Sequence, residues 1–267
     1  MKEITSKDNR IIKEAASLSE KKYRDSLGLY LLEGPNLVRE ALREDVRLKF
    51  IFTLAGGETP EILQLARACE AAGPAVFTVS REAFARIALT DTPQGILAVA
   101  EKKKSSQEDL FARPGCNVLV MDRIQDPGNM GTMIRTADAA GFSGIVLMKG
   151  SADPFGPKVV RSAAGSLFRL PVMTGVSPDE LRALLQKWGK TPYAAAMDGQ
   201  CAYYEADLAQ DIALVVGNEG NGVSGQLMAL SRTISIPMAG RTESLNAALA
   251  AGIIIFESLR QKSLCNK

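Results

Sequence analysis

From Asn117 onward, short apolar runs alternate with helical patterns, and this alternation limits how the chain can fold more than any other feature. The runs Asn117–Met121, Gly144–Met148 and Ile212–Val216 are apolar almost throughout. Continuous apolar strands separated by helices are typical of a mostly parallel sheet covered by helices on both faces. We therefore predict an α/β fold. Further strands are expected at Phe168–Met173, Tyr193–Met197 and Ile234–Ile236, and helices at Asn129–Ala140, Pro157–Ser166, Pro178–Trp188 and Gly222–Ser231.

Residues 1–104 predict a smaller α/β domain. Strand patterns at Leu29–Leu32, Val46–Phe52, Ala75–Val79 and Gly95–Ala100 alternate there with helical patterns. The charged stretch Glu101–Glu108 follows and has no apolar residue, which is typical of a linker. We therefore expect a domain at 1–104, a linker at 105–115 and a second domain at 116–267.

Composition excludes several classes of protein. The 267 residues include no histidine, which rules out imidazole bases and Ser-His-Asp catalysis, and the four cysteines are too dispersed for a disulfide framework or a zinc site. Hence we expect no metal. No apolar run approaches the roughly 20 residues that span a bilayer, and the first residues lack a signal-peptide pattern. The sequence predicts a cytoplasmic protein without a membrane partner.

The formal net charge of +2 means that a nucleic-acid partner would need a local basic surface. Such a surface is a candidate in the first 24 residues, which carry seven Lys and Arg against four Asp and Glu. This segment fits either a solvated helix face or contacts with RNA phosphates.

Three loops follow strands of the predicted parallel sheet, at the end where ligands bind in such folds. The first loop, Asp126–Gly131, holds Asn129 and leads into a helix that carries Arg135. The third follows the strand that ends at Pro237 and leads through Met238–Glu243 to Ser244 and Asn246. Ser244 is the expected cap of the long helix after it. The alternative is that Asn129 merely caps its helix and that Arg135 forms a surface ion pair.

The second loop, Gly217–Gly222, is rich in glycine but does not fit a phosphate site. Its glycines are spaced GxxGxG, and the Lys-Ser/Thr pair of a P-loop is missing. Glycines let a backbone approach a ligand closely. Glu219 at the centre of the loop would repel a phosphate, so a neutral or cationic ligand fits better. A turn with a solvated glutamate remains the alternative.

At these residues the sequence resembles a known family. The segments DPGNMGTMIRTADAAGF, LVVGNEGNGVS and ISIPMAGRTESLNAALAAGIIIFE resemble the three motifs of the SpoU (TrmH-type) branch of the SPOUT methyltransferases, in the same order, and Lys158–Ser166 is also similar. The match covers about residues 116–260. More loosely, residues 1–104 resemble the family's optional N-terminal L30e/L7Ae-like domain, which contacts RNA, through SKDNRIIKEAASLSEKKYR, LLEGPNLVREAL and TPQGILAVAE.

The resemblance implies a deep trefoil knot in the C-terminal domain, S-adenosylmethionine (AdoMet) as cofactor, and an obligate homodimer. It places cofactor binding on Gly217, Ile236 and Leu245. It also places the functional side chains on the following positions: Asn129, Arg135, Glu219, Ser244 and Asn246. The implied activity is methyl transfer to a ribose 2′-OH of RNA, most of all of 23S ribosomal RNA.

Removal of the 2′-OH proton is the demanding step of that reaction. Without histidine, we expect Arg135 to contact the 2′-OH and a neighbouring phosphate, and either deprotonated Arg135 or the phosphate to accept the proton. DNA lacks the 2′-OH and should not be a substrate. The alternative functions are a transfer-RNA 2′-O-methyltransferase and a knotted RNA-binding protein without catalysis that acts in ribosome assembly.

Overall fold

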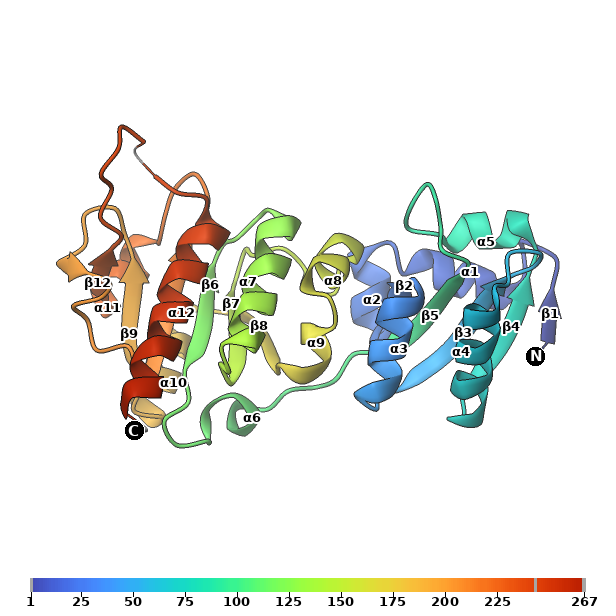
Figure 1. Cartoon of the computed structure of the whole chain (residues 1–267), viewed down its shortest axis with the longest axis horizontal. Coiled ribbons are helices and arrows are strands. Elements are labelled where there is room, and N and C mark those ends of the chain that lie inside the picture. Colours follow the sequence, from blue (N-terminus) through green and yellow to red (C-terminus); the bar gives the residue numbers. More distant parts are fainter. Residues whose placement is uncertain (1, 243, 266–267) are drawn as a thin grey trace. The chain divides into compact units, whose positions relative to one another are not determined.

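The computed structural model describes residues 2–242 and 244–265 (Figure 1). The chain forms two compact units. Unit 1 comprises residues 2–103 and Phe155–Phe168, and unit 2 comprises Lys104–Pro154 and residues 169–265. The segment Phe155–Phe168 therefore groups with unit 1, although it lies in the second half of the sequence.

Unit 1 has a five-stranded sheet in the order β1-β4-β3-β5-β2. Strands β1, β4 and β3 are parallel, and β5 runs antiparallel to both of its neighbours. Its core is formed by side chains such as Phe52, Phe84 and Leu97. The elements are β1 (Lys2–Ile4), α1 (Arg10–Ser17), α2 (Lys21–Leu27), β2 (Leu29–Glu33), α3 (Pro35–Arg43), β3 (Leu48–Leu54), α4 (Pro60–Ala71), β4 (Ala75–Val79), α5 (Arg81–Ile87), β5 (Ile96–Glu101), α8 (Pro157–Ala163) and α9 (Ser166–Arg169).

Unit 2 confirms the predicted parallel sheet. Its seven strands follow the order β10-β12-β9-β11-β6-β7-β8, and every neighbouring pair is parallel. The elements are α6 (Gln107–Phe111), β6 (Val118–Asp122), α7 (Pro127–Ala139), β7 (Gly144–Met148), β8 (Val172–Val176), α10 (Pro178–Lys187), β9 (Thr191–Ala195), β10 (Cys201–Ala202), β11 (Ile212–Gly217), α11 (Gly225–Leu230), β12 (Arg232–Ser235) and α12 (Ala247–Cys265).

Helices bury both faces of this sheet, which explains why its central strands are apolar throughout. Alternate residues such as Val118 and Val120 pack with α6, α10 and α11 in one core cluster. Because side chains alternate across a strand, Leu119 and Met121 point to the other face. Helices α7 and α12 pack side by side in front of the sheet (Figure 1).

Several element bounds differ from the sequence predictions. The residues expected to form a linker, 105–115, contain helix α6, because Leu110 and Phe111 bury their side chains in unit 2. The strand expected at Phe168–Met173 begins only at Val172, since the buried Phe168 belongs to helix α9. Strands β1 and β10 are too short to leave a periodic pattern.

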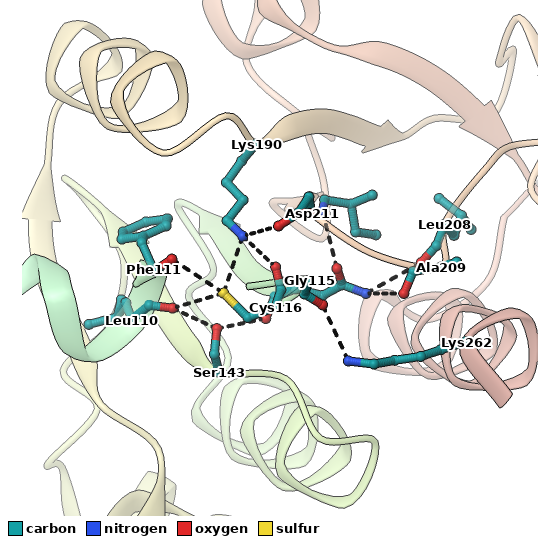
Figure 2. Close-up of polar contacts among 12 residues, drawn as sticks. Leu110, Phe111, Gly115, Cys116, Ser143, Lys190, Leu208, Ala209, Asp211 and Lys262 are labelled. Carbon is teal, nitrogen blue, oxygen red and sulfur yellow. Dashed lines mark hydrogen bonds and ion pairs between the residues drawn. The ribbon is translucent and has the colours of Figure 1, made fainter. Parts of the chain in front are cut away.

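A buried lysine holds the amino ends of three neighbouring strands of unit 2 together (Figure 2). Lys190 lies just before β9, and its Nζ donates to Oδ1 of Asp211 at 2.6 Å, just before β11. The same Nζ donates to the carbonyl of Cys116 at 2.8 Å, two residues before β6. The amino ends are therefore fixed by internal contacts, and the loops with functional residues follow the carboxyl ends.

Candidate active site

A cavity of about 440 Å³ lies at the carboxyl ends of β9, β11 and β12. Its wall includes all three residues predicted to bind a cofactor: Gly217, Ile236 and Leu245. Glu219 and Ser244, two of the predicted functional residues, also line it. The volume is in the range of small-molecule sites, and apolar walls with a few polar groups are typical of them.

The glycine loop after β11 forms one side of this cavity. The loop turns back on itself, with backbone hydrogen bonds in both directions between Asn218 and Gly222. A Cβ atom on Gly217 would lie only 2.1 Å from the backbone carbon of Gly222, so no larger residue fits there. Asn218 fixes the loop further, because its Oδ1 accepts from the backbone N–H groups of Gly220 and Asn221.

A chain of hydrogen bonds connects the three loops singled out in the sequence. Asn246 donates from Nδ2 to Oδ1 of Asn129 at 3.0 Å. Asn129 in turn donates from its Nδ2 to Oε1 of Glu219 at 3.1 Å. Three predicted site residues, distant in sequence, thus lie in one contiguous cluster beside the cavity.

Glu219 is held as a charged carboxylate. Partial burial alone would raise its pKa, but the hydrogen bonds it accepts outweigh this and lower the pKa below the usual value. The donors include its own backbone N–H, the Asn129 amide, and the backbone N–H groups of Asp126 and Gln125. The cluster therefore places a fixed negative charge at the cavity, which fits a cationic group in a bound ligand.

Asn246 has a second function at the start of α12. Its Oδ1 accepts from the backbone N–H groups of Ala248 at 2.9 Å and Leu249 at 3.2 Å. The prediction that Ser244 caps this helix is therefore wrong, because the helix begins only at Ala247. Ser244 is exposed and lines the cavity instead. Glu243, which was included in the predicted loop, lies outside the described residues.

Arg135 is not part of the hydrogen-bonded cluster. It lies on α7, is exposed, and its side chain forms no hydrogen bond or ion pair with any residue that the structure describes. Helix α7 begins at Pro127, where Oδ1 of Asp126 accepts from the backbone N–H of Asn129 at 2.7 Å. The alternative of a surface ion pair for Arg135 is therefore not realised within residues 2–242 and 244–265.

One residue that the sequence interpretation missed, Asp122, supports the site. It ends β6, is only 3% exposed, and accepts the backbone N–H of Ser224 on Oδ2 at 2.6 Å. Ser224 follows the glycine loop, so Asp122 fixes the exit of that loop. The available signal was an acidic residue at the end of an apolar run, four residues before the first motif.

The basic residues of the first segment are mostly engaged within unit 1. Lys7 pairs with Glu82, Lys13 with Asp8, and Lys21 with Asp25. Arg24 is buried and donates to the carbonyls of Leu18 and Ser19. The three lysine side chains are nevertheless at least 50% exposed, so both the solvated helix face and the RNA contact stay open for this segment.

Two kinds of feature, a metal site and a membrane-spanning helix, are absent from the described part of the chain. No group of His, Cys, Asp and Glu side chains within it could hold a metal ion. None of its helices is long and apolar enough to cross a membrane.

Two segments of the chain match the sequence models of known families. Residues 117–256 match the sequence model of the SpoU rRNA Methylase family, and residues 9–98 match that of the MRM3-like substrate binding domain. One relative, the 23S rRNA (guanosine(2553)-2′-O)-methyltransferase RlmP of Bacillus subtilis, is 38% identical over 260 residues, which cover 96% of this chain and 98% of that protein.

Solved structures show the same similarity over nearly the whole chain. A crystal structure of an AdoMet-bound rRNA methyltransferase from Sinorhizobium meliloti gives a TM-score of 0.87 at 34% identity, covering 97% of each chain. The SpoU methyltransferase AviRb from Streptomyces viridochromogenes gives 0.86 at 28% identity, covering 96% of this chain and 99% of that one.

Proposed function

Because this chain belongs to the SpoU rRNA methylase family, we propose that it transfers a methyl group from AdoMet to a ribose 2′-OH of 23S ribosomal RNA. The observation that carries the proposal is the Asn246–Asn129–Glu219 hydrogen-bonded chain, which joins the three loops at one cavity. An RNA methyltransferase needs such a junction, because it must hold a small cofactor and a ribose in contact with each other.

The cavity fits AdoMet. Its apolar wall, which includes Ile234, Ile236 and Leu245, is suited to the adenosine, and the Glu219 carboxylate is suited to a cation. The backbone of Gly217 borders the cavity without a side chain. When bound, AdoMet supplies an electrophilic methyl group on a sulfonium. We propose that Gly217, Ile236 and Leu245 hold the cofactor.

Arg135 is the residue that we propose to orient the 2′-OH. Its guanidinium is exposed and free of polar partners among the described residues, so its donors are available to RNA. An arginine stays protonated at neutral pH, which makes it a poor base. We therefore assign Arg135 a forked contact to the 2′-OH and a neighbouring phosphate, and we assign the proton to that phosphate.

The remaining site residues position these groups. Asn129 and Asn246 orient the nucleotide through the amide groups at the junction of the loops, and Glu219 holds the first and second loops together. Ser244 lines the cavity with a hydroxyl that can contact the ribose. Exclusion of water by the apolar wall would strengthen each of these polar contacts.

Unit 1 is proposed to bind the RNA substrate. Its match to a substrate-binding domain at residues 9–98 supports this role, and we propose an L30e/L7Ae-like fold for it. The relatives described above align over both units, which favours ribosomal over transfer RNA. For unit 2 we propose the deep trefoil knot of its family, and for the whole protein a cytoplasmic location, where it would meet ribosomal RNA.

A homodimer is also proposed. Helix α12 exposes three large apolar side chains, Leu249, Phe256 and Leu264, at 55%, 50% and 57%. Their spacing places them along one stripe of the helix. An exposed apolar stripe next to α7, the helix that carries Arg135, is suited to cover by a second copy.

The test is methyl transfer from labelled AdoMet to unmodified ribosomal RNA and, separately, to unmodified transfer RNA. We expect label in the ribosomal RNA. Label only in transfer RNA would replace the proposed substrate with the alternative one. AdoMet binding without label in either pool would indicate an assembly intermediate as substrate, and no AdoMet binding would support the non-catalytic alternative.

A further inference from the structure

Arg123, immediately after β6, has a backbone conformation that side-chain-bearing residues rarely adopt. Its φ is +56°, in the left-handed region that favours glycine. Residues held in such conformations cluster at functional sites, where the surrounding contacts compensate for the strain. The compensating contact is visible here, because the carbonyl of Arg123 accepts from Nδ2 of Asn218 in the glycine loop at 2.9 Å.

A buried carboxylate anchors the Arg123 side chain. Asp122, with only 4% of its side chain exposed, accepts from Nε of Arg123 at 3.2 Å. The stem of Arg123 runs past Gly150 in the loop after β7, where a Cβ atom would lie 3.5 Å from its Cγ. The arginine is therefore held at its Nε, and its stem lies near Gly150.

The outer part of the guanidinium remains available. The Arg123 side chain is 40% exposed. No hydrogen bond reaches its two terminal nitrogens from the described residues, although Nε is bonded. A guanidinium with one edge on a carboxylate and the other edge in solvent can bind a phosphate with two parallel donors.

We propose that Arg123 is a substrate-contacting residue that binds a backbone phosphate of the RNA next to the methylated nucleotide, and that Asp122 positions it. The location supports this role, since Arg123 lies between Asp122, which holds the exit of the glycine loop, and Gln125, which donates to Glu219. The inference rests on the proposed function, because it requires RNA as the substrate.

The decisive measurement is the salt dependence of RNA affinity. A phosphate contact releases about one counterion, so its loss reduces the slope of log K against log [salt] by roughly 0.7 to 0.9. We would compare the wild type with Arg123→Gly, which suits the left-handed backbone, and with Arg123→Asn, which also tolerates it. Binding would be measured on an unmodified 23S ribosomal RNA fragment.

Two further variants separate phosphate contact from a structural effect. Asp122→Asn keeps the arginine charge but leaves one acceptor oxygen for the two donors, Arg123 Nε and the backbone N–H of Ser224, so the salt slope should stay while the KM for RNA rises. The AdoMet Kd of this variant is measured as well, because it reports any effect through the glycine loop. Arg182→Gln removes an arginine of similar exposure, 52%, which pairs with Asp179 on α10. This matched control should change neither the salt slope of RNA binding nor the KM for RNA.

We expect Arg123→Gly and Arg123→Asn to raise the KM for RNA about tenfold, to lower the salt slope by nearly one, and to leave the AdoMet Kd unchanged. An unchanged slope in both variants would overturn the role of Arg123. A weakened AdoMet Kd with an unchanged slope would show that Arg123 only supports the loop. If the wild type itself neither binds nor methylates RNA, the proposed function fails instead.

Discussion

Arg135 is exposed on α7 and has no polar partner among the described residues, so the proposed reaction depends on what its guanidinium meets in the substrate. Arg135→Lys keeps the charge but loses the fork that would hold the 2′-OH and the phosphate together. We expect kcat to fall by about 100-fold, because misplaced reacting groups cost on that order. The AdoMet Kd should not change.

The control for this prediction is Arg182→Lys, an exposed arginine on α10. It should retain full activity. Turnover of Arg135→Lys within a few fold of the wild type would show that the fork at this position is not needed.

Glu219 gives a prediction about pH. Its pKa in the folded protein is lowered from the usual 4.5, so folding favours the charged form. The stabilisation is therefore fully present above the unfolded pKa and is lost as the pH falls through the lower folded value. The difference in Tm between the wild type and Glu219→Gln should be constant from pH 8 to about 5.5 and shrink only below about 4.5. A difference that already shrinks near pH 6 would contradict a carboxylate stabilised in its charged form.

That three loops meet at one end of the sheet was predictable, because each of them follows a strand of a parallel sheet. Their geometry was not predictable. The bonds from Asn246 to Asn129 and from Asn129 to Glu219 span 117 and 90 residues of sequence. The positive φ of Arg123 and its bond to Asp122 are likewise not encoded by any periodic pattern.

Among the elements, α12 is connected to the site through Asn246, which both caps this helix and bonds to a site residue. Asn246 caps the helix with Oδ1 and donates to Asn129 with Nδ2. Asn246→Asp keeps an acceptor for the cap but loses the donor, whereas Asn246→Ala loses both. We expect Asn246→Ala to lose about 1 kcal/mol of the free energy of unfolding, and Asn246→Asp to lose little.

Both variants should lose methyl transfer, since neither can donate to Asn129. Chemical denaturation together with an activity assay separates the two functions. An active Asn246→Asp variant would show that the Asn246–Asn129 hydrogen bond is not required.

The pattern of elements was largely predictable because both faces of the unit 2 sheet are buried. Strands such as β7 (Gly144–Met148) are therefore apolar along their full length, and their bounds were predicted correctly. The predicted bounds of an element were wrong where the burial of its side chains depends on contacts with distant segments. Leu110 and Phe111 follow a charged segment, and their helix, α6, combines a local capping box of Ser106 and Asp109 with burial of the two side chains in the core of unit 2.

For the whole molecule, the division of the sequence at about residue 104 did not anticipate that Phe155–Phe168 belongs with unit 1. The link is made by contacts such as the rings of Tyr30 and Phe155, whose centroids are 5.0 Å apart. Such contacts between distant segments are not encoded in local periodicity, so the pattern of residues 155–168 gives no sign that this segment groups with residues 2–103.

The proposed homodimer gives a prediction at this scale. Phe256→Asp would place a charge in the exposed apolar stripe of α12, and burial of an unpaired charge is costly. In light scattering, we expect the wild type to have twice the chain mass of 28.6 kDa and the variant to be a monomer. Tyr204→Asp, which changes an exposed aromatic residue outside the stripe, is the control and should remain dimeric.

The most direct test of the central claim is to incubate the wild-type protein with unmodified ribosomal RNA and AdoMet that carries a deuterated methyl group, followed by digestion to nucleosides and mass spectrometry. The cluster around Asn129, Glu219 and Asn246 predicts a single 2′-O-methylated nucleoside that carries the deuterium label on its ribose. Deuterium label on a nucleobase instead of a ribose would contradict the assignment of this site to ribose methylation.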